Sequence, residues 1–392
     1  MQLEIVSPLH DARFTALLDA AFQRTDRESK LVRELARGYP DFDPGLALLA
    51  SDGGAPLGCA LFVPRTIRLR GAWVKVAIAA PIGVHPAAHR RGVGRFLLAT
   101  GLGALKDRGL RGAIGIGASE FYGAFGFESA FNAYVQRVPV LALPVEGDTS
   151  NWRGLAERDL ALLPELHARC LEGVDGCELR RAAALEWESA APGSYTLVAE
   201  RDGALEAALR FRVRAEVELS ECVVANPAGV DSVLRFLRRL AREHSRGRVD
   251  THLPPSHPVA RELFRRGAVN ESNRLGGAAR LAVVDWPGLF ADTRASWLAA
   301  LERAKRDAVS LGLGGVDHEL ARRGSELVVT PGRRASAHVA LPAGWSAGLV
   351  TGQLDHRDLV FAHGAEPELA RAFFPGGTPQ WSYAPIFEVA DE

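Results

Sequence analysis

Apolar positions in the first 140 residues alternate between the two-residue period of strands and the longer period of helices. Residues 10–22 carry apolar side chains at helical spacing, whereas 46–50 and 57–69 are strand-like runs on either side of a turn at 52–54. The pattern predicts strands at 3–6, 46–50, 57–69, 73–84 and 112–117, and helices at 10–22, 28–36, 92–108 and 119–125. This alternation predicts an α/β domain with a central sheet.

A basic, glycine-containing turn joins the strand that ends at Val84 to the next predicted helix. The segment 82–95 reads I-G-V-H-P-A-A-H-R-R-G-V-G-R. Amides in the first turn of a helix attract anions, glycine lets a phosphate approach the main chain, and arginine adds forked donors. The turn therefore predicts a pyrophosphate site formed by His89, Arg90, Arg91, Gly92, Val93, Gly94 and Arg95.

The second third of the chain repeats the first in weakened form. An offset of 141 residues places Pro86 on Pro227 and Gly126 on Gly267. The repeated elements are a hairpin, a helix and a strand, at 196–213, 233–242 and 249–253. This correspondence indicates an internal duplication, with chance similarity of two α/β segments as the alternative.

The glycines of the basic turn do not repeat. At the same offset Gly92 and Gly94 correspond to Val233 and Arg235, whose side chains would crowd a pyrophosphate. We therefore expect the second copy to be degenerate and unable to bind the ligand of the first.

From residue 285 onward the pattern changes to helices around a few strand-like runs. It predicts helices at 295–304 and 367–374 and strands at 326–330, 336–341 and 359–362. The predicted domains are 1–142, 143–284 and 285–392, and the predicted class is α/β (α+β) with two tandem related domains and a C-terminal α+β domain.

Composition narrows the function classes. Lysine plus arginine and aspartate plus glutamate both number 47, which gives no electrostatic reason to expect a nucleic-acid partner. No apolar run reaches the roughly 18 residues that span a bilayer, so we expect a cytoplasmic protein without a membrane partner. The four cysteines show no C-x-x-C pair, and no metal site is predicted.

The order of strand, basic turn, long helix and strand is followed by A-S-E-F-Y-G-A-F-G-F at 118–127. This arrangement resembles the acetyl-CoA site of the GNAT N-acetyltransferases, with His89 where that family usually has arginine or glutamine. The resemblance implies that the backbone of Ile82, Gly83 and Val84 holds the thioester and pantetheine, and that Ser119 contacts the coenzyme. It also implies that Tyr122 is the general acid, with a packed aromatic as the alternative.

The base and the acceptor site follow from the same resemblance. In the Eis-like (enhanced-intracellular-survival) enzymes the terminal carboxylate enters the active site, which implies Glu392 as the base, with water relayed to Glu120 or Glu34 as the alternative. Asp26, Glu28 and Glu120 are the residues expected to attract a cationic amine.

Over the full length the chain is similar to the Eis acetyltransferases, with an active GNAT domain, an inactive one and a sterol-carrier-like domain. The resemblance implies an acetyl-CoA-dependent N-acetyltransferase that takes a small-molecule or side-chain amine and forms a homo-oligomer such as a hexamer. Two alternatives remain open: a non-catalytic CoA-binding regulator, and a lipid carrier that works through the C-terminal domain.

Overall fold

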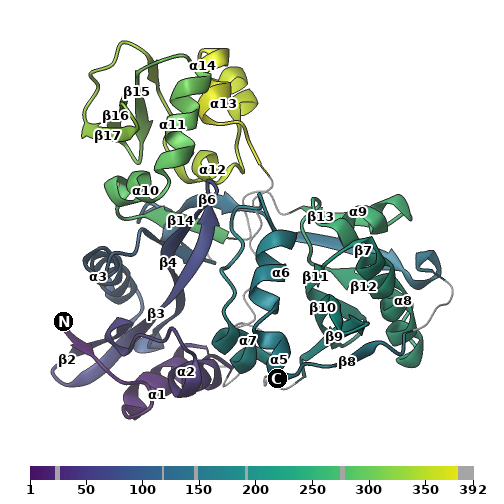
Figure 1. Ribbon diagram of the computed structural model, residues 1–392. Helices are drawn as coiled ribbons and strands as arrows, with labels where there is room; N and C mark the ends of the chain where they lie inside the picture. The colour runs from purple at the N-terminus through teal and green to yellow at the C-terminus, as the bar shows by residue number, and fades with distance from the viewer. Residues whose placement is uncertain (23–26, 117–118, 145–148, 190–192, 274–278, 378–392) are drawn as a thin grey trace. The chain divides into compact units, whose positions relative to one another are not determined.

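The computed structural model describes residues 1–22, 27–116, 119–144, 149–189, 193–273 and 279–377 (Figure 1). By their contacts these residues form two compact units. The first unit comprises the described residues of 1–37, 41–132 and 276–379, and the second those of 38–40 and 133–275. Each unit is therefore assembled from segments that are distant in the sequence.

A sheet of seven strands lies in the first unit, in the order β1-β2-β3-β4-β5-β14-β6. Its strands are β1 (Gln2–Ile5), β2 (Ala47–Asp52), β3 (Ala55–Leu69), β4 (Ala72–Val84), β5 (Gly112–Gly115), β6 (Glu128–Phe131) and β14 (Ala279–Val283). Neighbouring strands are antiparallel except β4 and β5, which are parallel. Gly53 and Gly54 have positive φ angles and form the turn between β2 and β3, which confirms the predicted hairpin.

Helices accompany this sheet where the sequence predicted them. They are α1 (Ala12–Ala21), α2 (Arg27–Gly38), α3 (Val93–Asp107) and α4 (Ser119–Gly123), with 3-10 turns η1 (Pro44–Leu46) and η2 (Pro86–Ala88). On α3, Leu97, Leu98 and Leu105 are fully buried in the core of the sheet. Gly101 of α3 lies so close to Phe62 that a Cβ atom there would fall 2.0 Å from the ring, so glycine sets the approach of this helix.

The second unit contains a similar sheet, in the order β13-β7-β12-β11-β10-β9-β8. Its strands are β7 (Tyr134–Pro139), β8 (Trp152–Gly154), β9 (Tyr195–Arg201), β10 (Ala204–Val213), β11 (Val217–Val224), β12 (Arg248–Thr251) and β13 (Val269–Asn273). Its helices are η3 (Val140–Ala142), α5 (Glu157–Leu160), α6 (Leu163–Cys170), α7 (Ala182–Ser189), α8 (Pro227–Glu243) and α9 (Pro258–Arg265). The β9–β10 hairpin, α8 and β12 confirm the repeated elements predicted from the sequence.

The two sheets exchange one strand each. β7 follows β6 in the sequence but pairs with β12 and β13 of the second unit. β14 follows β13 but pairs with β5 and β6 of the first unit. The same place in both sheets is thus filled by a strand from the other half of the chain, which supports the predicted duplication.

The C-terminal part of the first unit has a four-stranded sheet in the order β17-β16-β15-β18. Its elements are α10 (Trp286–Asp292), α11 (Arg294–Arg303), β15 (Ala308–Leu313), β16 (Val316–Arg323), β17 (Glu326–Pro331), β18 (His338–Val339), α12 (Ser346–Thr351), α13 (His356–His363) and α14 (Pro367–Phe373). α12 is anchored on β6, because Ala347 N donates to Glu128 at 2.6 Å and Thr351 Oγ1 donates to Ala130 O at 2.6 Å.

One predicted strand is wrong. Residues 359–362 lie in helix α13, which begins with a capping box between Asp355 and Asp358 and ends before Gly364 at a φ of 60°. A short apolar run fits a strand or a helix equally well, and here the flanking cap residues decide. The strand predicted at 336–341 is present only at His338–Val339.

The mixed α/β class with several domains is confirmed. The likeness of the C-terminal part to sterol carriers and the boundaries 1–142, 143–284 and 285–392 stay predictions. No helix among the described residues combines the length and the apolar composition needed to cross a bilayer.

Candidate active site

A cavity of about 620 Å³ opens in the first unit where β4 ends and α3 begins. The end of α1, the end of β4, the basic turn, the start of α3 and helix α4 all contribute to its wall. The lining residues are Ala21, Phe22, Ile82, Val84, Ala88, His89, Arg90, Gly92, Val93, Gly94, Arg95, Phe121 and Tyr122. Its volume is in the usual range for small-molecule sites.

One edge of β4 is unpaired beside this cavity. β4 pairs with β5 only at Ala77 and Ile78, so the residues 79–84 have no strand on that side within the described part of the chain. A β-bulge at Ala80 and Pro81, which together face Leu61 of β3, bends β4 at this point. The backbone N–H and C=O groups of this edge are therefore available to an extended ligand.

Gly83 lies where helix α1 comes close to the end of β4. It pairs in register with Cys59 of β3. A Cβ atom at Gly83 would lie 3.2 Å from both Ala21 Cβ and Leu18 Cδ2. Glycine at this position allows α1 to pack closely against the end of β4, where Ala21 lines the cavity.

The turn after β4 leaves the start of α3 open. Gly92 is the N-cap with a φ of 79° and has no side chain to cap the helix. The first α-helical bond runs from Phe96 N to Gly92 O at 2.9 Å, so the amides of Val93, Gly94 and Arg95 precede it. A helix start of this kind offers three N–H donors and the positive end of the helix dipole to an anion.

The two glycines of the turn have distinct roles. A Cβ atom at Gly92 would meet open space, so its positive φ is what requires glycine. A Cβ atom at Gly94 would lie 3.4 Å from the Phe121 ring and 3.5 Å from Val84 Cγ2. A larger side chain at Gly94 would therefore fill the space between α3, α4 and the end of β4.

The basic side chains of the turn divide into two groups. Arg90 and Arg95 line the cavity, and Arg90 has a φ of 61°. Arg91 instead forms an exposed ion pair with Asp52 at 3.2 Å. His89 Nε2 lies 3.2 Å from Val84 O, so its ring reaches back to the strand end.

Tyr122 lies in α4, the short helix that follows β5, and lines the cavity. Its side chain is 8% exposed, and its ring contacts Phe121 and Phe127 with centroid distances of 5.3 and 5.1 Å. A Cβ atom at Gly115 would lie 3.0 Å from this ring, so glycine makes room for it. Burial raises the pKa of the Tyr122 phenol, which therefore stays protonated at neutral pH.

The residues expected at the acceptor site are only partly described. Asp26 and Glu392 lie outside the described residues. Glu28 is in the first turn of α2, where its Oε2 atom is buried with no hydrogen-bond partner in the described part of the chain. Glu120 is exposed on α4, and Ser119 begins that helix.

Four lining residues were not anticipated: Ala21, Phe22, Ala88 and Phe121. Ala21 and Phe22 come from the end of α1, which is distant in sequence from the turn. Phe121 directly precedes Tyr122 in the motif at 118–127, so its position next to a predicted site residue could have indicated that it lines the cavity. Nothing in the local pattern of α1 indicates that its end meets β4.

Among the described residues, no group of three or more His, Cys, Asp or Glu side chains is placed to hold a metal ion.

Residues 11–130 match the family described as acetyltransferase (GNAT) domain. Among solved structures, a GCN5-related N-acetyltransferase from Anabaena variabilis ATCC 29413 aligns with a TM-score of 0.74 at 15% identity, over 97% of this chain and 98% of that chain. A GCN5-related N-acetyltransferase from Kribbella flavida aligns with a TM-score of 0.73 at 17% identity, over 97% of both chains.

Eis1 from Mycobacterium abscessus aligns with a TM-score of 0.65 at 17% identity, over 97% of this chain and 99% of that chain. No curated protein matches this chain. The structural neighbours share the fold over almost the whole length. The chain carries a GNAT acetyltransferase domain and is an enzyme of the acyltransferase class, and GNAT domains take the acyl group from acetyl-CoA or another acyl-CoA.

Proposed function

We propose that the first unit transfers an acetyl group from acetyl-CoA to a primary amine, by direct attack of the amine on the thioester in a ternary complex. The observation that carries this proposal is the cavity at the end of β4. There the open amides of α3, the unpaired edge of β4 and the buried Tyr122 line one space.

The start of α3 fits the diphosphate of the coenzyme. The amides of Val93, Gly94 and Arg95 are the donors, and the guanidinium groups of Arg90 and Arg95 add charge-assisted hydrogen bonds. Gly94 has no Cβ atom, which leaves the space between α3 and Phe121 for a ligand. His89 and Arg91 stay proposed coenzyme contacts. His89 also lines the cavity while its Nε2 lies 3.2 Å from Val84 O, and Arg91 is exposed beside Asp52.

The unpaired edge of β4 fits the extended pantetheine arm. Main-chain groups of Ile82, Gly83 and Val84 pair with its amides, and a main-chain N–H at this edge polarises the thioester carbonyl. Holding the amine and the thioester in reacting geometry lowers the barrier, in the best cases by about 7–11 kcal/mol. Positioning is therefore the main contribution of the backbone.

Tyr122 is the proposed general acid. The amine nitrogen attacks the carbonyl carbon, the C–S bond breaks, and the phenol O–H donates its proton to the departing thiolate. The raised pKa of Tyr122 suits this role because an acid must hold its proton until the thiolate forms. Ser119, the first residue of α4, is assigned a contact with the coenzyme.

The base and the acceptor rest on the sequence alone. Glu392 is the proposed base that takes the proton lost by the amine, and water relayed to Glu120 or Glu34 is the alternative. Asp26, Glu28 and Glu120 are the proposed residues that attract a cationic acceptor. The cytoplasmic location and the homo-oligomer, such as a hexamer, are proposals of the same kind.

The test is release of the free thiol from acetyl-CoA in the presence of a panel of amines: an aminoglycoside, a polyamine, a lysine peptide and small metabolite amines. We expect at least one amine to accelerate thiol release above hydrolysis and to gain about 42 mass units by mass spectrometry, the net change when an acetyl group replaces a hydrogen atom on nitrogen. Tight binding of acetyl-CoA without release for any amine would favour a regulatory protein instead.

A further inference from the structure

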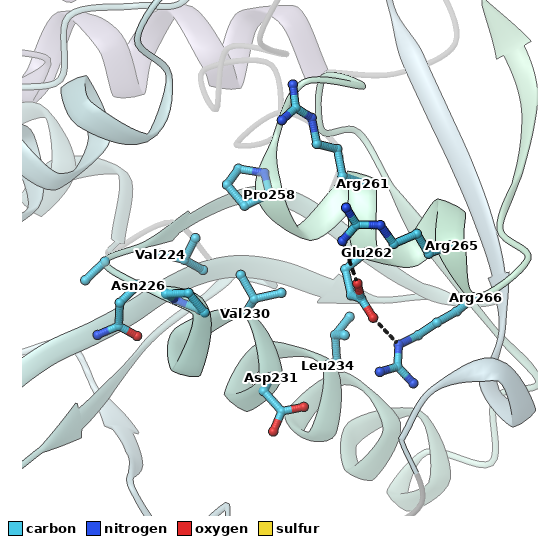
Figure 2. A pocket seen from close by; sticks show the side chains of 12 residues that line it. Val224, Asn226, Val230, Asp231, Leu234, Pro258, Arg261, Glu262, Arg265 and Arg266 are labelled. Atoms are coloured by element: carbon cyan, nitrogen blue, oxygen red, sulfur yellow. Dashed lines mark hydrogen bonds and ion pairs between the residues drawn. The ribbon is translucent and has the colours of Figure 1, made fainter.

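A second cavity, of about 560 Å³, lies in the second unit at the end of β11. It takes the same place in the duplicated fold as the first: a strand end, the start of the following helix, and the next helix. Figure 2 shows α8 on one side and α9 on the other. Its lining residues are Val224, Ala225, Asn226, Pro227, Val230, Asp231, Leu234, Pro258, Arg261, Glu262, Arg265 and Arg266.

This cavity lacks the features that hold a diphosphate in the first unit. Residues 85–92 separate β4 from α3, whereas only Ala225 and Asn226 separate β11 from α8. The segment equivalent to the basic turn is therefore helical, and its amides are used in the hydrogen bonds of α8. The start of α8 is also occupied, because Asn226 Oδ1 accepts from Gly229 N at 2.9 Å.

Arginine side chains of α9 nevertheless make this cavity basic. Arg265 and Arg266 both contact Glu262, at 3.2 and 2.9 Å, so they share one carboxylate (Figure 2). Arg261 has neither an ion pair nor a side-chain hydrogen bond with any described residue. The cavity thus has more guanidinium groups than its own carboxylates neutralise.

The remaining carboxylate does not change this balance. Asp231 lines the cavity but forms an ion pair with Arg235, one turn further along α8. Arg235 is not among the lining residues. A net positive charge therefore remains at the α9 side of the cavity.

The opposite wall is apolar. Val224 at the end of β11 is 7% exposed, and Val230 and Leu234 reach into the same space from α8 (Figure 2). An apolar wall gives affinity through burial of a ligand's hydrocarbon part, and guanidinium groups select a phosphate or carboxylate. The two walls together match a molecule with one apolar end and one anionic end.

We propose that the second unit binds a small organic anion that has a compact apolar body and a single phosphate or carboxylate. The anionic group binds Arg261 and the neighbouring Arg265 and Arg266, and the body lies on Val230 and Leu234. This site is separate from acetyl transfer in the first unit. Its ligand is not the diphosphate of a coenzyme, because the cradle for that group is helical here.

Calorimetry on the full-length chain tests the site with three small probes that share a phenyl ring: phenyl phosphate, phenylacetate and benzyl alcohol. We expect the anions to bind and the neutral alcohol not to bind, and the stronger of the two anions identifies the preferred head group. Binding that falls as salt is raised is also expected. Failure of both anions to bind, or equal binding of the alcohol, would overturn the proposal.

Charge reversal locates the site. Arg261→Glu should weaken binding of the preferred anion by about tenfold or more, because an attraction becomes a repulsion. Arg242→Glu, an equal change of charge at an exposed position on α8 outside the cavity, is the matched control and should leave binding unchanged. Equal loss in both variants would place the anion elsewhere.

Two further measurements complete the test: anion binding by a variant whose cavity is filled by a larger side chain, and thiol release from acetyl-CoA. Val230→Trp should abolish binding while the thermal unfolding midpoint shows that the chain still folds. Tyr122→Phe, which concerns the first unit, should leave anion binding unchanged. Conversely, Arg261→Glu should leave thiol release from acetyl-CoA unchanged, so this proposal and the proposed acetyl transfer fail independently.

Discussion

Helices α3 and α8 take equivalent places in the two units, but they begin differently. The difference lies in the groups that accept hydrogen bonds from the backbone N–H groups of the first helical turn. In the first unit α3 begins at Gly92, which has no side chain to act as a cap. In the second unit Asn226 caps α8 and His257 caps α9, the latter through Val259 N to Nδ1 at 3.1 Å. A side-chain cap and an anionic ligand compete for the same amides.

If the proposed function is correct, this difference is the physical reason why the first copy binds coenzyme and the second does not. The first copy has a connection of eight residues, 85–92, between β4 and α3, which contains the 3-10 turn η2. The second copy converts the equivalent residues to helix and caps it internally. Loss of the site therefore adds hydrogen bonds within the chain, while retention leaves amides open. The following predictions test this comparison.

The largest expected effect comes from filling the open helix start. Gly94→Trp should abolish measurable binding of acetyl-CoA, because the new side chain would occupy the space beside Phe121. Calorimetry measures the dissociation constant. Gly103→Leu is the matched control on the same helix, since a Cβ atom at Gly103 meets nothing within 4 Å. An unchanged dissociation constant in Gly94→Trp would place the diphosphate elsewhere.

A capped helix start in the second unit should make that unit sensitive to acid. The main effect on His257 is its burial, which lowers its pKa from an ordinary value of 6.5 to about 4. In the folded chain its Nε2 donates a hydrogen bond to Cys222 O at 3.0 Å. The unfolded chain takes up this proton below pH 6.5 and the folded chain does not. Stability should therefore fall by about 3 kcal/mol as the pH drops from 6.5 to 4.

Hydrogen exchange of the β11 amides as a function of pH measures this loss after correction for the intrinsic exchange rate. His257→Gln removes the titrating group and should flatten the dependence in this pH range. A dependence that persists unchanged in His257→Gln would assign the acid sensitivity to another group.

The turn at 82–95 and Tyr122 were recognisable in the sequence because each depends on neighbours in the chain. A strand end, two glycines and a helix start are local, and the cavity is built around them. Contributions from distant segments were not recognisable. Ala21 lines the cavity because Gly83 lets α1 approach β4, a contact that no periodicity encodes.

The pairing of strands that are distant in the sequence could not be predicted either, because it too depends on contacts between distant segments. β7 and β14 are not among the strands predicted from the sequence, and nothing in their patterns indicates that each joins the sheet of the other half. At residues 359–362 the error was of another kind, since four apolar residues fit both periods and only the flanking Asp355 and Gly364 resolve the choice.

Removal of the Tyr122 hydroxyl group tests whether the cavity of the first unit catalyses acetyl transfer. Tyr122→Phe keeps the ring contacts with Phe121 and Phe127 and removes the proposed proton donor. We expect turnover to fall by about 100-fold. This loss is at the lower end of the range typical for removal of a general acid, because water can also protonate the departing thiolate. Acetyl-CoA affinity should stay nearly unchanged. A wild-type rate across the pH range would remove Tyr122 from the mechanism.

The smallest effect concerns the cap of α8. Asn226→Ala removes the acceptor for Gly229 N and should cost about 1 kcal/mol of stability in the second unit, measured by hydrogen exchange in the first turn of α8. Asn226→Asp, which restores an acceptor oxygen, should recover the loss. Acetyl-CoA binding should not change in either variant. Coenzyme binding by the second unit of Asn226→Ala would show that the cap alone prevents binding there. We expect no such binding, because the helical geometry of α8 leaves no equivalent of the turn at 85–92.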